Sequence, residues 1–193
     1  MKEGDDFVGI LLAAGRSRRF GGDKLLHPLS DGTPLALASA NALHAVLPRT
    51  VAVVRPGNKA LIELFAAHGI ETVIAEHADS GMGASLAAGI AATAKASGWL
   101  IALADMPAVP VAAIAGVRDA LLAGAAIAAP SNGGRRGHPV GFSSRYRAEL
   151  LALEGDAGAR RLLERDGSGV VEITIDSDGI FADIDFPGDL KYL

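Results

Sequence analysis

The chain has 193 residues, enough for one domain with a sizeable hydrophobic core and too few for two ordinary domains. Its net charge of −4 argues against a nucleic-acid-binding face, which is usually basic, so any polyanion that it binds should be small. The chain contains no cysteine, which excludes disulfides, thiolate metal sites and cysteine nucleophiles. The acidic N-terminus and the short apolar runs do not support secretion or membrane spanning, and we expect a cytoplasmic protein.

Apolar segments of strand length alternate with longer segments of helical period along the first two thirds of the chain. The predicted strands are residues 7–13, 51–55, 71–75, 99–104 and 125–129. The predicted helices are residues 34–46, 58–68, 84–96 and 110–122. Thr33 before Pro34 is a predicted helix N-cap, and Gly69 is a predicted helix stop. The alternation predicts an α/β fold with right-handed crossovers and a mainly parallel central sheet covered by helices on both faces.

The regular alternation of predicted strands and helices ends in the last third of the chain. Residues 131–138 are rich in Gly, Arg and Asn, which predicts an irregular loop. After it we expect a short strand at 139–142, helices at 144–153 and 157–165, and strands at 170–175 and 180–184. No linker, repeat or low-complexity tail interrupts the pattern. We therefore expect a single domain over residues 1–193, with residues 1–6 flexible.

The segment LAAGRSRRFGGDK follows the first predicted strand, at the end of the sheet where open α/β folds bind ligands. Small residues allow close backbone approach, so the N–H groups of residues 15–22 can face an anion. Its spacing is neither that of a Walker loop nor that of a dinucleotide fingerprint. The alternative is a solvated basic loop. The basic side chains available to hold phosphate are Arg16, Arg18, Arg19 and Lys24.

Carboxylates follow two other predicted strands. Asp105 in WLIALADMP emerges at the edge of the ligand crevice, where it suits Mg²⁺, although it could instead cap the helix near Pro110. Asp183 and Asp185 in ADIDFPGDL could supply a second carboxylate to the same ion. The alternative is that one of them caps a helix that starts at Pro187.

Two further motifs contain glycines beside residues that could bind a ligand. In GMGASLAAGI, Gly81 and Gly83 allow the backbone to approach a planar group, and the N–H groups around Ser85 could contact a base or a phosphate. The alternative is an Ala-rich helix with a flexible start. GGRRGHPVGF places Arg136 and His138 on the longest irregular loop, where binding residues concentrate, unless this segment is a plain surface hairpin.

GDAGARRLL begins with a residue typical of helix starts. Asp156 is predicted to be the N-cap of a helix that contains Arg160 and Arg161. For this motif the structural interpretation is favoured over a binding role.

Together these motifs resemble the nucleotidyltransferases whose signature loop reads LAAG, any residue, Gly or Ser, any residue, Arg, an apolar residue and Gly, followed by Lys. GMGASLAAG, DMP, RRGHPVGF, GDAGAR and DIDxPxDL occur in the order found in the molybdenum cofactor cytidylyltransferase branch. The resemblance covers residues 8–190 and implies a Rossmann-like, glycosyltransferase-A type nucleotidyltransferase fold that uses Mg²⁺. Phe186 and Gly188 replace the commoner Thr and Glu of the last motif.

The resemblance also implies roles for individual residues. Arg19, Lys24 and Asp105 would be catalytic, the first two on the triphosphate and Asp105 on Mg²⁺. Asp185 would be the second metal ligand. A larger set would form the nucleotide pocket and the region that meets the acceptor: Leu12, Ala13, Ala14, Gly15, Gly81, Gly83, Ser85, Arg136 and His138.

The function implied by the resemblance is transfer of CMP from CTP to the terminal phosphate of molybdopterin, which releases pyrophosphate and forms the cytosine dinucleotide cofactor. LAAG, where guanylyltransferase relatives usually read LAGG, favours CTP over GTP. A guanylyltransferase and a sugar- or alcohol-phosphate nucleotidyltransferase are alternatives within this class. An NADPH-dependent reductase and a non-catalytic chaperone of cofactor maturation are alternatives from other classes. We expect nucleotide and pterin substrates and a recipient molybdoenzyme as partners, but no nucleic acid or membrane.

Overall fold

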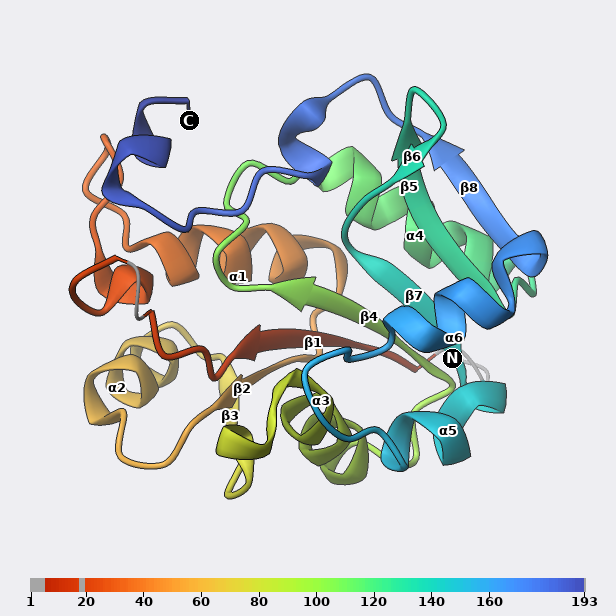
Figure 1. Ribbon diagram of the computed structural model, residues 1–193, viewed down its shortest axis with the longest axis horizontal. Helices are drawn as coiled ribbons and strands as arrows, with labels where there is room; N and C mark the ends of the chain where they lie inside the picture. Colours follow the sequence, from red (N-terminus) through yellow and green to blue (C-terminus); the bar gives the residue numbers. More distant parts are fainter. Residues whose placement is uncertain (1–5, 18–19, 193) are drawn as a thin grey trace.

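The computed structural model describes residues 6–17 and 20–192 (Figure 1). Its eight strands form one mixed sheet in the order β3-β2-β1-β4-β7-β5-β6, with β8 paired to β5. Neighbouring strands pair in parallel except for β6 and β7, which run antiparallel to their partners. The strands are β1 (Phe7–Ala13), β2 (Thr50–Val54), β3 (Glu71–Ile74), β4 (Gly98–Leu103), β5 (Ile127–Asn132), β6 (Arg135–Arg136), β7 (Val140–Ser143) and β8 (Val170–Thr174).

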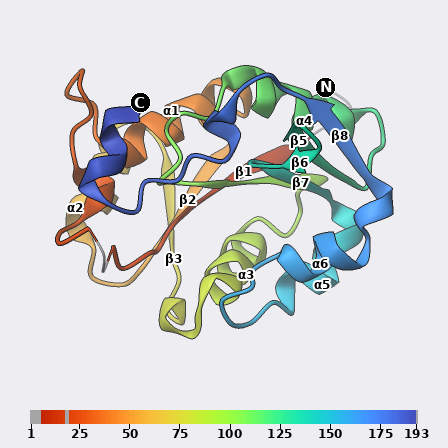
Figure 2. The ribbon, with the colours of Figure 1, turned by 45° about the horizontal axis from the view of Figure 1, so that its top comes forward.

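Helices cover both faces of the sheet. The α-helices are α1 (Leu35–Val46), α2 (Lys59–Ala67), α3 (Met82–Ala92), α4 (Val111–Leu122), α5 (Arg147–Leu151) and α6 (Arg160–Arg165). Helices α1 and α4 lie on one face, whereas α3, α5 and α6 lie on the other (Figures 1 and 2). The predicted α/β fold with a mainly parallel central sheet is therefore confirmed. None of the described helices is both long and apolar enough to cross a membrane.

The hydrophobic core has two layers because the central strands are buried on both sides. Along β1, Leu11 and Ala13 pack into the layer with α1, α2 and α4, while Val8 and Ile10 pack into the layer with α3, α5 and α6. Side chains alternate between the two faces of a strand, so a strand covered twice reads as one continuous apolar run. This explains why the first strand could be located from the sequence with its correct ends.

The carboxyl ends of β1 and β4 meet at the middle of the sheet. β1 pairs in parallel with β2 on one side and with β4 on the other, and the Ala104 N–H extends this contact by donating to the Leu12 carbonyl at 3.1 Å. From β1 the chain continues to β2 and β3 on one side of β1, and it then returns to form β4 on the other side. Such a switch of direction leaves a crevice at the strand ends, which is the usual ligand site of open α/β sheets.

The predicted strand at residues 180–184 is wrong. Ile180 ends a 3₁₀ helix, η5 (Asp178–Ile180), and Ile184 lies outside any strand. Both isoleucines are buried although neither lies in a strand. The Ile184 N–H donates to the Asp105 carbonyl at 3.0 Å and takes no part in the hydrogen bonds of the sheet. Two buried β-branched residues four apart imitate the pattern of a strand.

Two predicted helix caps are also wrong. Helix α1 begins at Leu35 with Pro34 at the cap position and no side-chain capping bond, so Thr33 is not its N-cap. Helix α6 begins at Arg160 with Ala159 at the cap position, so Asp156 lies outside it. The predicted stop after α2 is confirmed, because Gly69 adopts a φ of +70° two residues beyond the last helical residue.

The close approach of α3 to the sheet depends on Gly89. A Cβ atom there would lie 2.8 Å from Val53 Cγ2 and 3.1 Å from Ile10 Cγ2. Gly89→Val should lower the free energy of unfolding by about 1–3 kcal/mol through overpacking. Urea denaturation checks this, with Ala91→Val on the exposed side of α3 as the control. Equal losses in the two variants would contradict the packing argument.

Candidate active site

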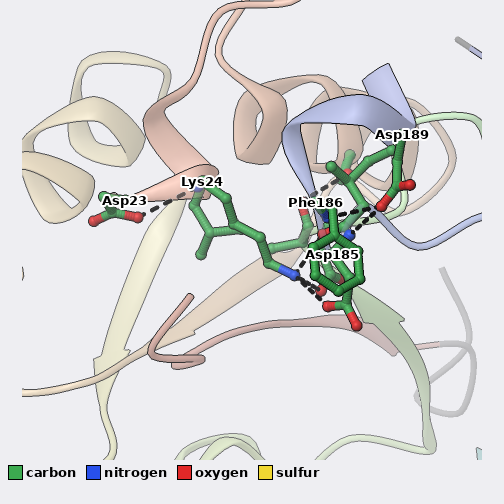
Figure 3. Close-up of polar contacts among 10 residues, drawn as sticks. Asp23, Lys24, Asp185, Phe186 and Asp189 are labelled. Carbon is green, nitrogen blue, oxygen red and sulfur yellow. Dashed lines mark hydrogen bonds and ion pairs between the residues drawn. The ribbon is translucent and has the colours of Figure 1, made fainter. Parts of the chain in front are cut away.

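A buried lysine, Lys24, lies near the carboxyl ends of β1 and β4, and Figure 3 shows its side chain pointing toward Asp185. The Lys24 Nζ atom donates to Asp105 Oδ2 at 2.7 Å, to the Ile184 carbonyl at 2.6 Å and to Asp185 Oδ1 at 3.3 Å. Only 9% of the lysine side chain is exposed. We call these three oxygens the oxygen cage. Of the predicted site residues, Lys24, Asp105 and Asp185 are therefore brought together by the fold.

Three distant segments supply the cage. Lys24 starts the 3₁₀ helix η1 (Lys24–Leu26), which follows the loop after β1, and Asp105 follows β4 by two residues. The C-terminal segment brings Asp185 because the Ile184 N–H donates to the Asp105 carbonyl and the Ile184 side chain is buried in the core. Backbone pairing thus places the second carboxylate beside the first.

The lysine remains protonated despite its burial. Burial alone would lower the pKa of Lys24, but the hydrogen bond and charge of Asp105, and then those of Asp185, raise it above its ordinary value of 10.5. The protonated Lys24 therefore faces Asp105 and Asp185 within the cage.

Asp189 fixes the backbone that carries Asp185. Its Oδ2 accepts hydrogen bonds from the N–H of Asp185 at 2.9 Å and of Phe186 at 2.7 Å (Figure 3). The bonds from Phe186 and Asp185 hold the pKa of the Asp189 carboxyl below its ordinary value. A 3₁₀ helix, η6, does begin at Pro187, but the carboxylate that accepts these N–H groups is Asp189. Asp185 is thereby left to face the lysine.

A second polar contact fixes η1 from the other side. Asp23 accepts hydrogen bonds from the Leu25 N–H at 3.3 Å and from Asn58 Nδ2 at 2.9 Å. Asn58 also caps α2, since its Oδ1 accepts from the Leu61 N–H at 3.3 Å. The backbone of Lys24 is therefore tied to the start of α2.

A cavity of about 410 Å³ opens beside Lys24 and Asp105. It brings together five of the residues predicted to bind the nucleotide: Leu12, Ala14, Gly15, Gly81 and Ser85. Ala13 instead points into the hydrophobic core, and Gly83 packs against the backbone of Glu154. Arg19 lies outside the described residues, as do Arg18 and residues 1–5, whose flexibility had been predicted.

The glycines at the start of α3 accommodate a loop of the protein itself. Gly81 has a φ of +109°, and a Cβ atom on it would clash with the carbonyl carbon of Gly155. The Gly83 N–H donates to the Gly155 carbonyl at 2.8 Å. This contact places Asp156 at the cavity wall, a position that its interpretation as a helix cap had missed.

An ion pair lies at the wall of the cavity beside Lys24. Arg16 Nε donates to Asp79 Oδ1 at 2.9 Å, and a second contact joins Nη2 to Oδ2. Both residues line the cavity, and their side chains are 49% and 70% exposed. The pair links the loop after β1 to η2 (Ala78–Ser80), the 3₁₀ helix before α3. Asp79 was not singled out from the sequence, where nothing relates it to Arg16.

A second cavity of about 740 Å³ adjoins the first. The two share four wall residues: Leu12, Met82, Leu103 and Asp156. The second cavity is also lined by Arg136 and His138, which were predicted to meet an acceptor, and by Arg160 and Arg161. Two cavities with a common wall can hold two reactants with their reacting groups close to the cage.

The two predicted acceptor residues differ in their availability. Arg136 Nε donates to Glu172 Oε1 and Nη2 to the Gly167 carbonyl, both at 2.7 Å, which ties its guanidinium to β8 and the turn before it. His138 Nδ1 is buried and has no hydrogen-bond partner among the described residues. Burial lowers the pKa of His138 below its ordinary value of 6.5, although Asp105 opposes this effect. His138 is therefore neutral at pH 7.

The carboxylates of the cage suit a hard cation. The described residues contain no group of three or more His, Cys, Asp or Glu side chains that could hold a metal ion. Asp105 and Asp185, however, already converge on one cation, the Lys24 ammonium. Mg²⁺ is commonly held by one or two carboxylates together with water and substrate phosphates, so this pair fits such an ion.

The sequence of residues 9–170 matches the profile of the MobA-like NTP transferase domain. The chain belongs to this family. The predicted nucleotidyltransferase family is thus confirmed at this level, while the cytidylyltransferase branch remains a prediction.

This MobA-like protein is also similar to two relatives that are named for different roles. It is 33% identical over 191 residues to the purine catabolism protein PucB of Bacillus subtilis, covering 93% of this chain and 92% of PucB. It is 30% identical over 166 residues to the nicotine blue oxidoreductase of Paenarthrobacter nicotinovorans, covering 82% of this chain and 81% of that protein.

The fold is shared with solved structures. Rv0371c of Mycobacterium tuberculosis superposes with a TM-score of 0.84 at 28% identity, covering 96% of each chain. A structure of Rv0371c in complex with manganese gives a TM-score of 0.81 at 26% identity, covering 97% of each chain. These matches confirm the predicted fold of the MobA-like domain.

The burial of His138 predicts a pH dependence of stability. In the unfolded chain His138 takes up a proton below about pH 6.5, whereas in the folded protein burial keeps its ring neutral to lower pH. Protonation therefore favours the unfolded chain, and the free energy of unfolding falls as the pH drops below about 6.5. Between pH 7 and pH 5 the wild type should lose more unfolding free energy than His138→Gln. Urea denaturation at both pH values measures this, and parallel losses would contradict it.

Proposed function

We propose that this protein is a divalent-metal-dependent nucleotidyltransferase that transfers CMP from CTP to the phosphate of molybdopterin, in the cytoplasm, for delivery to a molybdoenzyme. The observation that carries the proposal is the oxygen cage around Lys24, which borders one cavity that adjoins a second. Transfer between two phosphate compounds needs a site that holds cations close to the phosphates, and two binding spaces that share a wall.

Each part of the site has a role in this reaction. Lys24 would neutralise the triphosphate, and the small residues Ala14 and Gly15 would let backbone N–H groups approach it. Asp105 and Asp185 would hold Mg²⁺. The bound ion would offset phosphate charge and help to orient the triphosphate.

The protein would act mainly by alignment. An oxygen of the acceptor phosphate, bound in the second cavity, would attack the α-phosphorus of CTP as the bond to the β-phosphate oxygen breaks and pyrophosphate leaves. The acceptor phosphate is already an anion, so no general base is required. Neutral His138 would form part of the wall that the acceptor contacts. Alignment of two bound reactants can supply a large part of the rate acceleration.

A second candidate function is supported by the relative named nicotine blue oxidoreductase. In that case the first cavity would hold a reduced nicotinamide nucleotide and the second a flat organic acceptor. Hydride transfer does not need a metal ion. Metal-dependent binding of a nucleoside triphosphate therefore separates the two candidates.

Calorimetric titration of the purified chain tests the proposal. CTP should bind in the presence of Mg²⁺ and bind much more weakly when EDTA removes it, and GTP should bind more weakly than CTP. A preference for GTP would indicate a guanylyltransferase. NADPH binding without any metal-dependent triphosphate binding would refute nucleotidyl transfer and support the oxidoreductase.

Asp105→Asn keeps the size of the side chain but removes the charge that faces Lys24 and the metal. Loss of one such electrostatic contact should reduce Mg²⁺-dependent pyrophosphate release by about 100-fold or more. Asp119→Asn on the exposed surface of α4 is the matched control and should leave the rate unchanged. Far-UV circular dichroism confirms that both variants fold. A wild-type rate for Asp105→Asn would refute the metal assignment.

A further inference from the structure

We infer that the Lys24 ammonium and a divalent metal ion exclude each other from the oxygen cage, so that tight metal binding requires Lys24 to move onto the nucleotide. This inference rests on the proposed metal-dependent nucleotidyl transfer. It adds that Lys24 acts as a displaceable counter-ion and thereby couples the binding of metal and triphosphate.

The geometry places the ammonium where a metal ion would bind. Lys24 Nζ lies 2.7 Å from Asp105 Oδ2 and 3.3 Å from Asp185 Oδ1, between the two carboxylates that would coordinate the ion. It also lies 2.6 Å from the carbonyl oxygen of Ile184. An ion bound to both carboxylates would overlap the ammonium or lie in contact with it.

Charge makes joint occupancy unfavourable. Two carboxylates balance one divalent ion, so a lysine ammonium held in the same cage would add an unbalanced positive charge. Lys24 is buried, and water screens such repulsion weakly at a buried site. One of the two cations must therefore leave when the other binds.

The Lys24 side chain can move from the cage into the adjoining first cavity. Lys24 and Asp105 both line the first cavity, so the ammonium borders the space proposed for the triphosphate. A lysine side chain has a flexible four-carbon stem and can change partners without movement of its backbone, which Asp23 and Asn58 hold in place. The carboxylates stay behind, because Asp189 and the Ile184 N–H fix the segment that carries Asp185.

The consequence is reciprocal coupling. A triphosphate that attracts the lysine frees the cage for the metal, and a metal ion in the cage frees the lysine for the triphosphate. By linkage, each ligand then raises the affinity of the other by the same factor. Without nucleotide, metal binding should be weak because the lysine competes with it.

The first test measures Mn²⁺ binding to the full chain without nucleotide, by electron paramagnetic resonance of the free ion. Lys24→Met removes the competing charge and should tighten Mn²⁺ binding by about tenfold or more, within the usual range of coupling between sites. Lys95→Met is the matched control, because Lys95 is exposed and lies before β4, at the end opposite Asp105. Equal affinities of wild type and Lys24→Met would overturn the inference.

The second test uses the wild type, so it holds even if Lys24→Met fails to fold. A short pulse of acetic anhydride, read by peptide mass spectrometry, should label Lys24 slowly without metal because the side chain is buried. At saturating Mn²⁺, Lys24 labelling should rise several-fold while Lys95 labelling stays constant. Saturation with Mn²⁺ while Lys24 remains protected would show that the two cations coexist and would overturn the inference.

These outcomes separate the inference from the proposed function. If Mn²⁺ and Lys24 coexist while Mg²⁺-dependent CTP binding persists, only the exclusion fails. If CTP binds without any need for metal, the proposed function fails, whatever the Mn²⁺ titrations of the nucleotide-free protein show.

Discussion

The site depends on the burial of one lysine against two carboxylates at the middle of the sheet. An ammonium removed from water is stable only where opposite charges and hydrogen-bond acceptors surround it. Lys24 has both, from Asp105, Asp185 and the Ile184 carbonyl. This requirement forces the loop after β1, the end of β4 and the C-terminal segment to meet at one point. The crevice between the strand ends is thereby turned into a site of concentrated charge.

The carboxylates are positioned largely through the backbone. The Ile184 N–H pairs with the Asp105 carbonyl, and Asp189 binds the N–H groups of Asp185 and Phe186. Backbone hydrogen bonds fix the direction of a short segment without requiring a regular strand or a long helix. The C-terminal segment therefore contributes to the site although it lies outside the sheet, beside η1 and α1 (Figures 1 and 2).

The sequence predicted those features that depend on local patterns. Apolar runs of strand length located the buried strands, and the rule that ligands bind at strand ends pointed to Asp105 and to the basic loop that contains Lys24. Lys24 and Asp185 were chosen among their neighbours through the family resemblance, since the strand expected before Asp185 does not form. Contacts between distant loops could not be predicted in this way. The segment after Gly179 resembles a strand only because Ile180 and Ile184 are both buried. Asp156 resembled a helix cap, and its place at the cavity wall depends on the packing of Gly155 against Gly81, which no local pattern reveals.

Lys24 can neutralise phosphate charge but carries no information about a base or an acceptor, so specificity must come from the cavity walls. The relatives named for purine catabolism and for an oxidoreductase match 93% and 82% of this chain, and a shared fold does not fix the chemistry. Differences in the walls of the second cavity can change which acceptor a protein of this fold binds. Arg136 is engaged by Glu172 and Gly167, whereas the buried Nδ1 of His138 has no partner among the described residues. A neutral histidine in that wall would distinguish ligands by shape and hydrogen bonding rather than by charge, because burial keeps its ring unprotonated.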